Sequence, residues 1–106
     1  MTANQGFELH PGAAGDITNI WEFIAADNPA AAGRVRESIL DGIRGLVPFP
    51  SQGHSRADLT SRPLRFWTVR NYLIAYAPEE KPLLVIAVLD GRRSPRLIAA
   101  ILQSRR

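Results

Sequence analysis

Residues 64–89, LRFWTVRNYLIAYAPEEKPLLVIAVL, decide the fold of this chain. The stretch divides into three runs rich in apolar, β-branched and aromatic residues: Leu64–Val69, Tyr72–Ala77 and Leu83–Leu89. Runs of this composition are typical of strands, and connections as short as Arg70-Asn71 and Pro78–Pro82 join antiparallel neighbours. Asn71 tolerates the left-handed backbone conformation that a tight hairpin turn requires. The stretch therefore predicts an antiparallel meander of three strands.

The third of these strands is apolar at every position, so both of its faces require burial. Strict alternation divides it into two sets: Leu83, Val85, Ala87 and Leu89 on one face, and Leu84, Ile86 and Val88 on the other. Two amphipathic segments precede the meander, at residues 13–27 and 29–46, and Asn28-Pro29 ends one and caps the next. They predict a helical hairpin that covers one face of the sheet.

A last helix opens at Ser94-Pro95. Its apolar face consists of Leu97, Ile98, Ile101 and Leu102. Either this helix folds back over the second face of the sheet, or a partner protein covers that face.

A short strand at Phe7–His10 precedes the helical hairpin and is expected at an edge of the sheet. The predicted order is β-α-α-β-β-β-α, and the fold class is α+β: an antiparallel sheet with an N-terminal helical hairpin and a short C-terminal helix. A polar loop at residues 48–63 joins the hairpin to the meander. At 106 residues the chain has the size of one domain, so residues 1–106 are expected to fold as a single unit.

The composition excludes several classes of protein. The chain has no cysteine, which rules out a disulfide scaffold, a thiolate metal site and a cysteine nucleophile. No residue pattern predicts a metal ion or another cofactor. The longest apolar run is Leu83–Leu89, far short of the about 20 residues that span a bilayer, and Met1–Gly6 lacks the pattern of a secretion signal. We therefore expect a cytoplasmic protein that does not enter a membrane.

Charge is distributed unevenly along the chain. Residues 1–53 carry three arginines against six carboxylates, whereas residues 54–106 carry nine arginines and one lysine against four carboxylates. An arginine-rich half is typical of proteins that bind nucleic acid or an acidic protein. A solvated surface that keeps a small protein soluble has the same composition. Charge alone leaves both interpretations open.

Four local strings share their order and spacing with one family of bacterial toxins. They are Pro50-x-x-Gly53, Asp58-Leu59 followed by Arg65, Asn71-Tyr72-Leu73-Ile74-Ala75-Tyr76, and Ile86-Ala87-Val88-Leu89 ahead of Gly91-Arg92-Arg93. With the element order, they resemble the RelE/ParE toxins of type II toxin–antitoxin systems over residues 7 to about 102, and they look most like the ParE branch. The resemblance implies a toxin neutralised by an acidic antitoxin whose C-terminal segment wraps it. ParE members poison DNA gyrase, whereas RelE members cut mRNA on the ribosome.

The residues distinguish these two activities. RNA cleavage requires groups that move protons to and from the reacting oxygens. The resemblance places the RelE lysines on Leu64 and Phe66, a strand arginine on Leu73 and a tyrosine on about Ile98, and only the turn arginine survives, as Arg92. Apolar side chains cannot transfer protons, and the pKa of arginine is too high for acid–base work.

We therefore expect a stoichiometric inhibitor of gyrase rather than an enzyme, and no direct binding to nucleic acid by the toxin alone. Two alternatives remain open. One is a ribosome-dependent mRNA endonuclease with an unusual residue set. The other is a non-toxic family member that serves as antitoxin partner or corepressor.

The expected binding residues are Arg92, Arg93 and Arg96, with Arg70 near them across the end of the sheet. They would hold the target or the antitoxin, although a solvated turn would have the same composition. Leu97, Ile98, Ile101 and Leu102 would line the groove for the antitoxin. Asp90 stands where many related sequences have histidine, which further weakens nuclease chemistry.

Other notable residues receive structural interpretations. His10 ends the edge strand and His54 lies in the long loop, and we expect both to be solvated or locally hydrogen-bonded rather than catalytic. Trp21 and Trp67 are expected to pack in the core or on the sheet, as are Tyr72 and Tyr76 with Ile74 on one strand face. Arg105-Arg106 is expected to be a frayed basic end.

Overall fold

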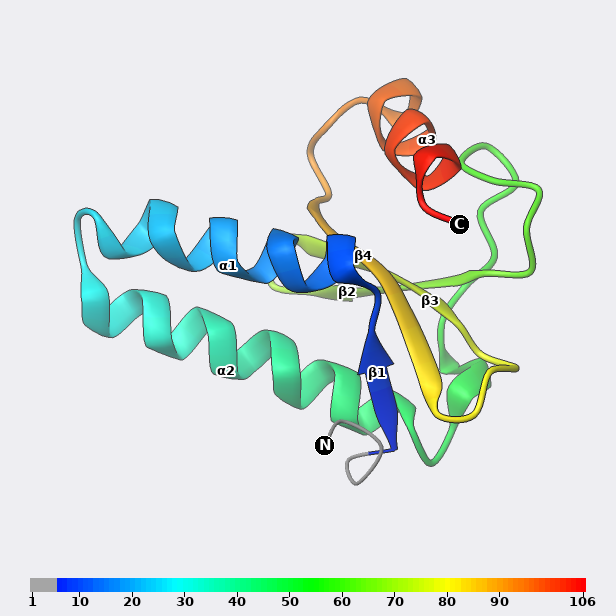
Figure 1. Cartoon of the computed structure of the whole chain (residues 1–106), viewed down its shortest axis with the longest axis horizontal. Coiled ribbons are helices and arrows are strands. Elements are labelled where there is room, and N and C mark those ends of the chain that lie inside the picture. The colour runs from blue at the N-terminus through cyan, green and yellow to red at the C-terminus, as the bar shows by residue number, and fades with distance from the viewer. Residues whose placement is uncertain (1–5) are drawn as a thin grey trace.

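The computed structural model describes residues 6–106 and has the α+β architecture that the sequence predicts (Figure 1). Three helices accompany one sheet of four strands in this part of the chain. In chain order the elements are β1 (Phe7–Leu9), α1 (Pro11–Ala25), α2 (Pro29–Leu46), a short 3₁₀ helix (Pro50–Gln52), β2 (Arg65–Val69), β3 (Tyr72–Ala77), β4 (Leu83–Asp90) and α3 (Pro95–Ser104). The predicted order is confirmed.

The strands lie in the spatial order β1-β4-β3-β2. The predicted meander is present: β2 pairs antiparallel with β3, which pairs antiparallel with β4. β1 lies at the edge, as expected, but it runs parallel to β4, with Phe7 opposite Leu83. Between β1 and β4 the chain passes through the α1–α2 hairpin, β2 and β3, so the connection is long enough for a parallel pair.

The helical hairpin owes its ends to local capping. The Asn28 side chain accepts a hydrogen bond from the Ala31 N–H at 3.0 Å, and Pro29 occupies the first position of α2. α1 begins at Pro11, two residues before the predicted start, because His10 caps it through Nδ1, which accepts from the Gly12 N–H at 2.9 Å. The local hydrogen bond expected for His10 is therefore confirmed.

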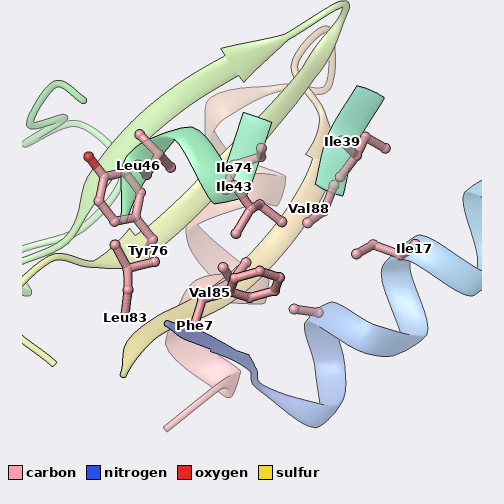
Figure 2. Close-up of a cluster of buried hydrophobic side chains, with 11 residues drawn as sticks. Phe7, Ile17, Ile39, Ile43, Leu46, Ile74, Tyr76, Leu83, Val85 and Val88 are labelled. Carbon is pink, nitrogen blue, oxygen red and sulfur yellow. The ribbon is translucent and has the colours of Figure 1, made fainter. Parts of the chain in front are cut away.

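The larger core lies between the sheet and the hairpin. Its buried members come from β1, both helices of the hairpin and the strands β3 and β4: Phe7, Ala13, Ile17, Ile39, Ile43, Leu46, Ile74, Tyr76, Leu83, Val85 and Val88. Figure 2 shows side chains of α2 and of the sheet pointing toward one another in this core. The Tyr76 hydroxyl donates to the Pro50 carbonyl at 2.6 Å and accepts from the Gly53 N–H, so its burial leaves no polar atom unpaired.

A smaller core lies on the other face of the sheet, where α3 folds back onto the strands. This is the first of the two alternatives that the sequence left open. The buried members are Leu59, Leu64, Phe66, Ala75, Ile86, Ala87, Leu89, Ile98 and Leu102. Ser94 caps α3 by accepting from the Leu97 N–H at 3.2 Å.

The strict alternation predicted for β4 is wrong at its centre. The register with β3 shifts between Ala75 and Tyr76, which face Ala87 and Val85, so Ile86 is an extra residue in β4. As a result Ile86 and Ala87 both belong to the smaller core, and Val88 belongs to the larger one. A bulge of this kind reverses the facing of every residue beyond it.

Three further expectations are corrected. At the β2–β3 turn the left-handed residue is Arg70, with φ of 56°, rather than Asn71. Trp21 is 40% exposed because the outer half of α1 projects past the sheet (Figure 1), whereas Trp67 packs against the larger core as predicted. The expectation of a frayed end at Arg105-Arg106 is wrong for Arg105, which is largely buried.

Arg105 is held by a set of polar contacts that we call the C-terminal clamp, made of Asp16, Arg62 and Arg105. Both oxygens of Asp16 accept from Arg105, with Nη2 at 2.9 Å from Oδ1, and Oδ2 also accepts from the Val88 N–H. Arg62 donates through Nη1 to the carbonyls of Leu102 and Arg105, at 3.0 and 2.7 Å. The clamp therefore ties the C-terminal end of α3 to α1, to β4 and to the loop before β2.

Candidate functional site

A cleft of about 560 Å³ opens between α1, the C-terminal end of β4 and α3, and we call it the α1–α3 cleft. Its lining combines an apolar floor with charged walls. The residues are Asp16, Asn19, Ile20, Phe23, Tyr72, Val88, Leu89, Asp90, Arg92, Arg93, Ile101 and Arg105. Its volume falls within the range of small-molecule pockets, roughly 300–1,000 Å³.

One wall of the cleft is the ion pair of Asp90 and Arg92. Arg92 Nε and Nη2 donate to the two carboxylate oxygens at 3.0 and 2.8 Å, and the Arg92 backbone N–H donates to Oδ1 at 2.9 Å. The hydrogen bonds from the Arg92 side chain, followed by the one from its backbone, lower the pKa of Asp90 to about 2. Asp90 thus fixes the guanidinium of the turn arginine, Arg92.

A second wall is the pair of Asp16 and Arg105, which belongs to the C-terminal clamp. Its side chains are largely buried, and the hydrogen bonds to Asp16 raise the pKa of Arg105. The Cα of Gly12 lies so close to this guanidinium that a Cβ there would collide with it. The pair is therefore built into the wall of the cleft and is not free to swing toward a partner.

Arg93 differs from the other two arginines of the cleft. It lines the cleft, and among residues 6–106 it takes part in none of the ion pairs. Asp16 and Asp90 are each neutralised by an arginine, so Arg93 supplies the excess positive charge of the cleft. An incoming carboxylate that binds Arg93 would therefore break none of the ion pairs of the described residues.

The apolar part of the cleft lining includes an exposed residue that sequence reasoning missed. Phe23 is 83% exposed and lines the cleft with Ile20 from α1 and Ile101 from α3. The signal that could have found it is its position outside the apolar stripe of α1: a large aromatic residue that the core does not need is a candidate contact for a partner.

The structure separates the expected binding residues into groups. Arg92 and Arg93 both line the cleft, whereas Arg96 and Arg70 are exposed and lie outside its lining. Arg70 stands at the same end of the sheet, since its neighbour Asn71 accepts the Gly91 N–H at 2.8 Å. Of the four arginines expected to form one cluster, Arg92 and Arg93 therefore line the cleft, and the other two lie outside its lining.

The four apolar residues of α3 also divide. Ile98 and Leu102 are buried in the smaller core, where they face the sheet. Leu97 is exposed, and Ile101 lines the α1–α3 cleft. While α3 lies on the sheet, only Leu97 and Ile101 of this set are open to a partner.

The two positions that the resemblance aligns with the RelE lysines are buried. Leu64 is 5% exposed and Phe66 3%, and both belong to the smaller core, as does Ile98 at the tyrosine position. The strand-arginine position, Leu73, packs against the same core. Arg92 is accessible but bound to Asp90. Among the described residues, these positions provide no group that could transfer a proton near neutral pH.

The remaining titratable candidates lie elsewhere. His54 is exposed in the loop before β2, where its backbone N–H and carbonyl pair with Phe66. Burial raises the pKa of the Tyr76 hydroxyl, which the larger core encloses. Within residues 6–106 no group of three histidines or carboxylates is placed to hold a metal ion.

The fold and the cleft define a small α+β protein suited to binding another macromolecule. Residues 7–95 match the family model of the ParE toxin of type II toxin–antitoxin systems, parDE, and the chain belongs to this family. The family assignment implies a cognate antitoxin as partner.

No curated protein matches the chain. None of the helices described is long and apolar enough to cross a bilayer.

Proposed function

We propose that this toxin inhibits DNA gyrase by binding to it in the bacterial cytoplasm, and that its cognate antitoxin neutralises it. Membership of the ParE family supports the role of toxin. The choice of gyrase over the ribosome rests on the chemistry of the residues. A protein that acts by binding needs shape and charge complementarity, and it needs no group that titrates during the cycle.

One observation carries this proposal. Leu64 and Phe66 occupy the positions where the nuclease branch has ionisable side chains, and both are buried in the smaller core. Charging either position would place an unpaired ion among apolar side chains. Arg92 alone can stabilise negative charge on a phosphate, but it cannot act as acid or base. These two buried positions favour inhibition by binding over RNA cleavage.

A supercoiling assay with purified gyrase and purified toxin tests the proposal. We expect inhibition that rises with the ratio of toxin to gyrase and that the antitoxin reverses. The same preparation should leave mRNA intact in a translating extract. Supercoiling at the normal rate, with or without cleavage of mRNA, would overturn the proposal.

Cell physiology gives a second readout. Expression of the toxin without its antitoxin should produce filamentous cells and induce the response to DNA damage. Rapid arrest of translation with cut transcripts would contradict the proposal in favour of the ribosome. Normal growth would contradict it in favour of a non-toxic partner or corepressor.

A paired substitution tests the arginines of the cleft. Arg92→Glu with Arg93→Glu should abolish toxicity or weaken antitoxin binding, because both positive charges at the mouth of the cleft are reversed. Arg34→Glu with Arg36→Glu makes the same change of charge on exposed positions of α2 and serves as the matched control. If the folded double variant of the cleft keeps full toxicity and full antitoxin affinity, the cleft arginines have no part in binding.

A further inference from the structure

The net positive charge of the chain lies in two segments at one end of the sheet. The β2–β3 turn, residues 70–71, carries Arg70, and residues 90–97 carry Arg92, Arg93 and Arg96. We call these four residues the sheet-end arginines. The two segments contain four of the thirteen basic residues and one of the ten acidic residues, Asp90, which leaves nine of each in the rest of the chain. The formal charge of +3 is therefore concentrated here.

Backbone contacts hold the two segments together. The Gly91 N–H donates to the Asn71 carbonyl at 2.8 Å, and Tyr72 lies opposite Asp90 in the β3–β4 register. A Cβ on Gly91 would lie 3.3 Å from the same carbonyl oxygen, so the two segments are in direct contact. Arg96 follows in the first turn of α3. The sheet-end arginines therefore form one patch rather than a charge spread over the surface.

Three of the four arginines are free to bind an anion. Arg70, Arg93 and Arg96 are exposed, and among residues 6–106 they take part in none of the ion pairs. Arg92 is bound to Asp90 through Nε and Nη2. A phosphate or carboxylate that binds the three free guanidinium groups therefore displaces no partner within the described part of the chain.

The arginines of the loop before β2 are used differently. Arg56 is paired with Asp58 through two hydrogen bonds. Arg62 donates to the carbonyls of Leu102 and Arg105, and Arg65 donates to the carbonyl of Gly53. These three guanidinium groups serve the fold, whereas the sheet-end arginines make no comparable contact apart from Arg92.

The backbone of Arg70 supports a use for its side chain. Its φ of 56° lies in the left-handed region, where glycine and asparagine are common and a large side chain is disfavoured. Unfavourable backbone conformations of this kind cluster at functional sites. Arginine at this position adds a cation beside residues 91–93 that glycine or asparagine would not supply.

The exposed residues around the sheet-end arginines are small or polar. They are Thr68, Asn71, Gly91, Ser94 and Pro95. Serine, threonine and asparagine side chains join arginine in contacts to DNA phosphates. The centre of a protein interface is commonly apolar, and single-stranded nucleic acid is commonly held by exposed aromatic rings. Leu97 is the one exposed large apolar residue of residues 68–73 and 90–97, so the patch resembles neither.

From these observations we infer that the sheet-end arginines bind the phosphate backbone of duplex DNA that gyrase holds beside the toxin. The inference rests on the proposed function, because gyrase brings the DNA. It adds that the target is the complex of gyrase with DNA rather than gyrase alone. About three phosphate contacts without base contacts give weak and salt-sensitive binding, so the toxin alone would hold DNA only at low salt.

Fluorescence anisotropy with the full-length toxin and a labelled duplex of random sequence tests the contact. Raising the salt from about 50 to 200 mM should weaken binding by the wild type about 50-fold, as expected for about three phosphate contacts. Arg70→Gln, Arg93→Gln and Arg96→Gln should each reduce the slope of log affinity against log salt by about one. The triple variant should lose the salt dependence almost completely.

A second triple variant is the matched control. Arg34→Gln with Lys81→Gln and Arg106→Gln removes the same charge from residues that are also exposed and outside the ion pairs of the described chain. It should keep the wild-type slope. Equal losses in the two triple variants would overturn the inference, because binding would then depend on net charge alone. Tighter binding of single-stranded RNA than of the duplex would also overturn it.

Binding to gyrase, measured with and without bound duplex DNA, separates this inference from the proposed function. Wild-type toxin should bind the complex with DNA about 10-fold more tightly than gyrase alone. Arg70→Gln with Arg96→Gln leaves both cleft arginines in place and should remove most of this preference, with affinity for gyrase alone unchanged.

The two proposals fail in different ways. Equal affinity of the wild type for gyrase with and without DNA would overturn the inference and leave gyrase as the target. Loss of antitoxin affinity in Arg70→Gln with Arg96→Gln, with DNA binding unchanged, would also overturn it and assign the patch to a protein partner. Absence of any binding to gyrase, with the duplex results as expected, would overturn the gyrase proposal and support the contact with DNA.

Discussion

The two faces of the sheet are covered in different ways. On one face, α1 and α2 bury a continuous set of aliphatic and aromatic side chains with β1, β3 and β4 (Figure 2). On the other face, α3 has only 10 residues, and the C-terminal clamp ties its end to α1 and to the loop before β2. The first cover rests mainly on burial, with one hydrogen bond from the Val88 N–H to Asp16 of α1, whereas the short α3 depends more on polar contacts at its C-terminal end.

The difference between the two covers explains where the α1–α3 cleft lies. The long helices α1 and α2 cover the first face along their length, but the short α3 leaves an opening along its side. The α1–α3 cleft is that opening. The family match ends at residue 95, where α3 begins, so the outer wall of the cleft is the part of the chain that the family pattern describes least.

The largest expected effect compares one residue from each core. Ile43→Ala should lower the free energy of unfolding by about 4 kcal/mol, because α2 and the sheet cannot collapse into the space. Ile98→Ala should cost about 2 kcal/mol, because the short α3 can shift toward the sheet. Urea denaturation measures both. Equal losses would show that the two faces are equally rigid.

A smaller effect is expected from the clamp. Arg105→Met should lower stability by about 2 kcal/mol, since it leaves the largely buried Asp16 carboxylate without its cation. Arg44→Met removes an exposed pair with Asp41 and should cost at most about 0.5 kcal/mol. Asp16→Asn added to Arg105→Met should recover part of the loss. A clamp variant as stable as the Arg44 control would contradict the role of polar contacts in holding α3.

Arg62 provides a more local test. Arg62→Gln removes the hydrogen bonds to the carbonyls of Leu102 and Arg105 and should cost about 1 kcal/mol. Amide hydrogen exchange should speed up in α3 and stay unchanged in α2, because the lost hydrogen bonds hold α3 and not α2. Uniform acceleration in both helices would mean that α3 does not open separately from the rest of the fold.

The smallest effect concerns the wall of the cleft at low pH. The pKa of Asp90 lies near 2, below the value of about 3.9 for a free aspartate, because Arg92 binds its charged form. Its contribution to stability is therefore complete above about pH 4 and is lost as the pH falls toward 2. NMR titration of the Asp90 carboxyl carbon measures the midpoint. In Arg92→Ala the midpoint should rise toward the free value, and an unchanged midpoint would contradict the pairing.

Local signals in the sequence predict most of the fold. Asn28-Pro29 and Ser94-Pro95 mark the starts of α2 and α3, because caps and prolines act within a few residues. The three runs of the meander form the strands within one residue of the predicted ends. Two arginines of the candidate site, Arg92 and Arg93, are also predicted from the local sequence Gly91-Arg92-Arg93.

The contacts that sequence reasoning missed are long-range or depend on register. Asp16 and Arg105 meet across 89 positions, and nothing near Arg105 in the chain distinguishes it from a solvated end. The bulge at Ile86 reverses the facing of Val88, an effect that an apolar run conceals because both faces look alike. Phe23 becomes part of a cleft only because α3 folds beside α1, a contact that the local sequence does not reveal.

The central claim is that the positions a nuclease would need are filled by buried apolar side chains. Its most direct test is to add purified toxin to translating ribosomes and map the ends of the mRNA, with Arg92→Ala as control. The account predicts intact transcripts with both proteins. Cleavage by the wild-type toxin that disappears with Arg92→Ala would contradict it, because that result would show a catalytic centre in the turn after β4.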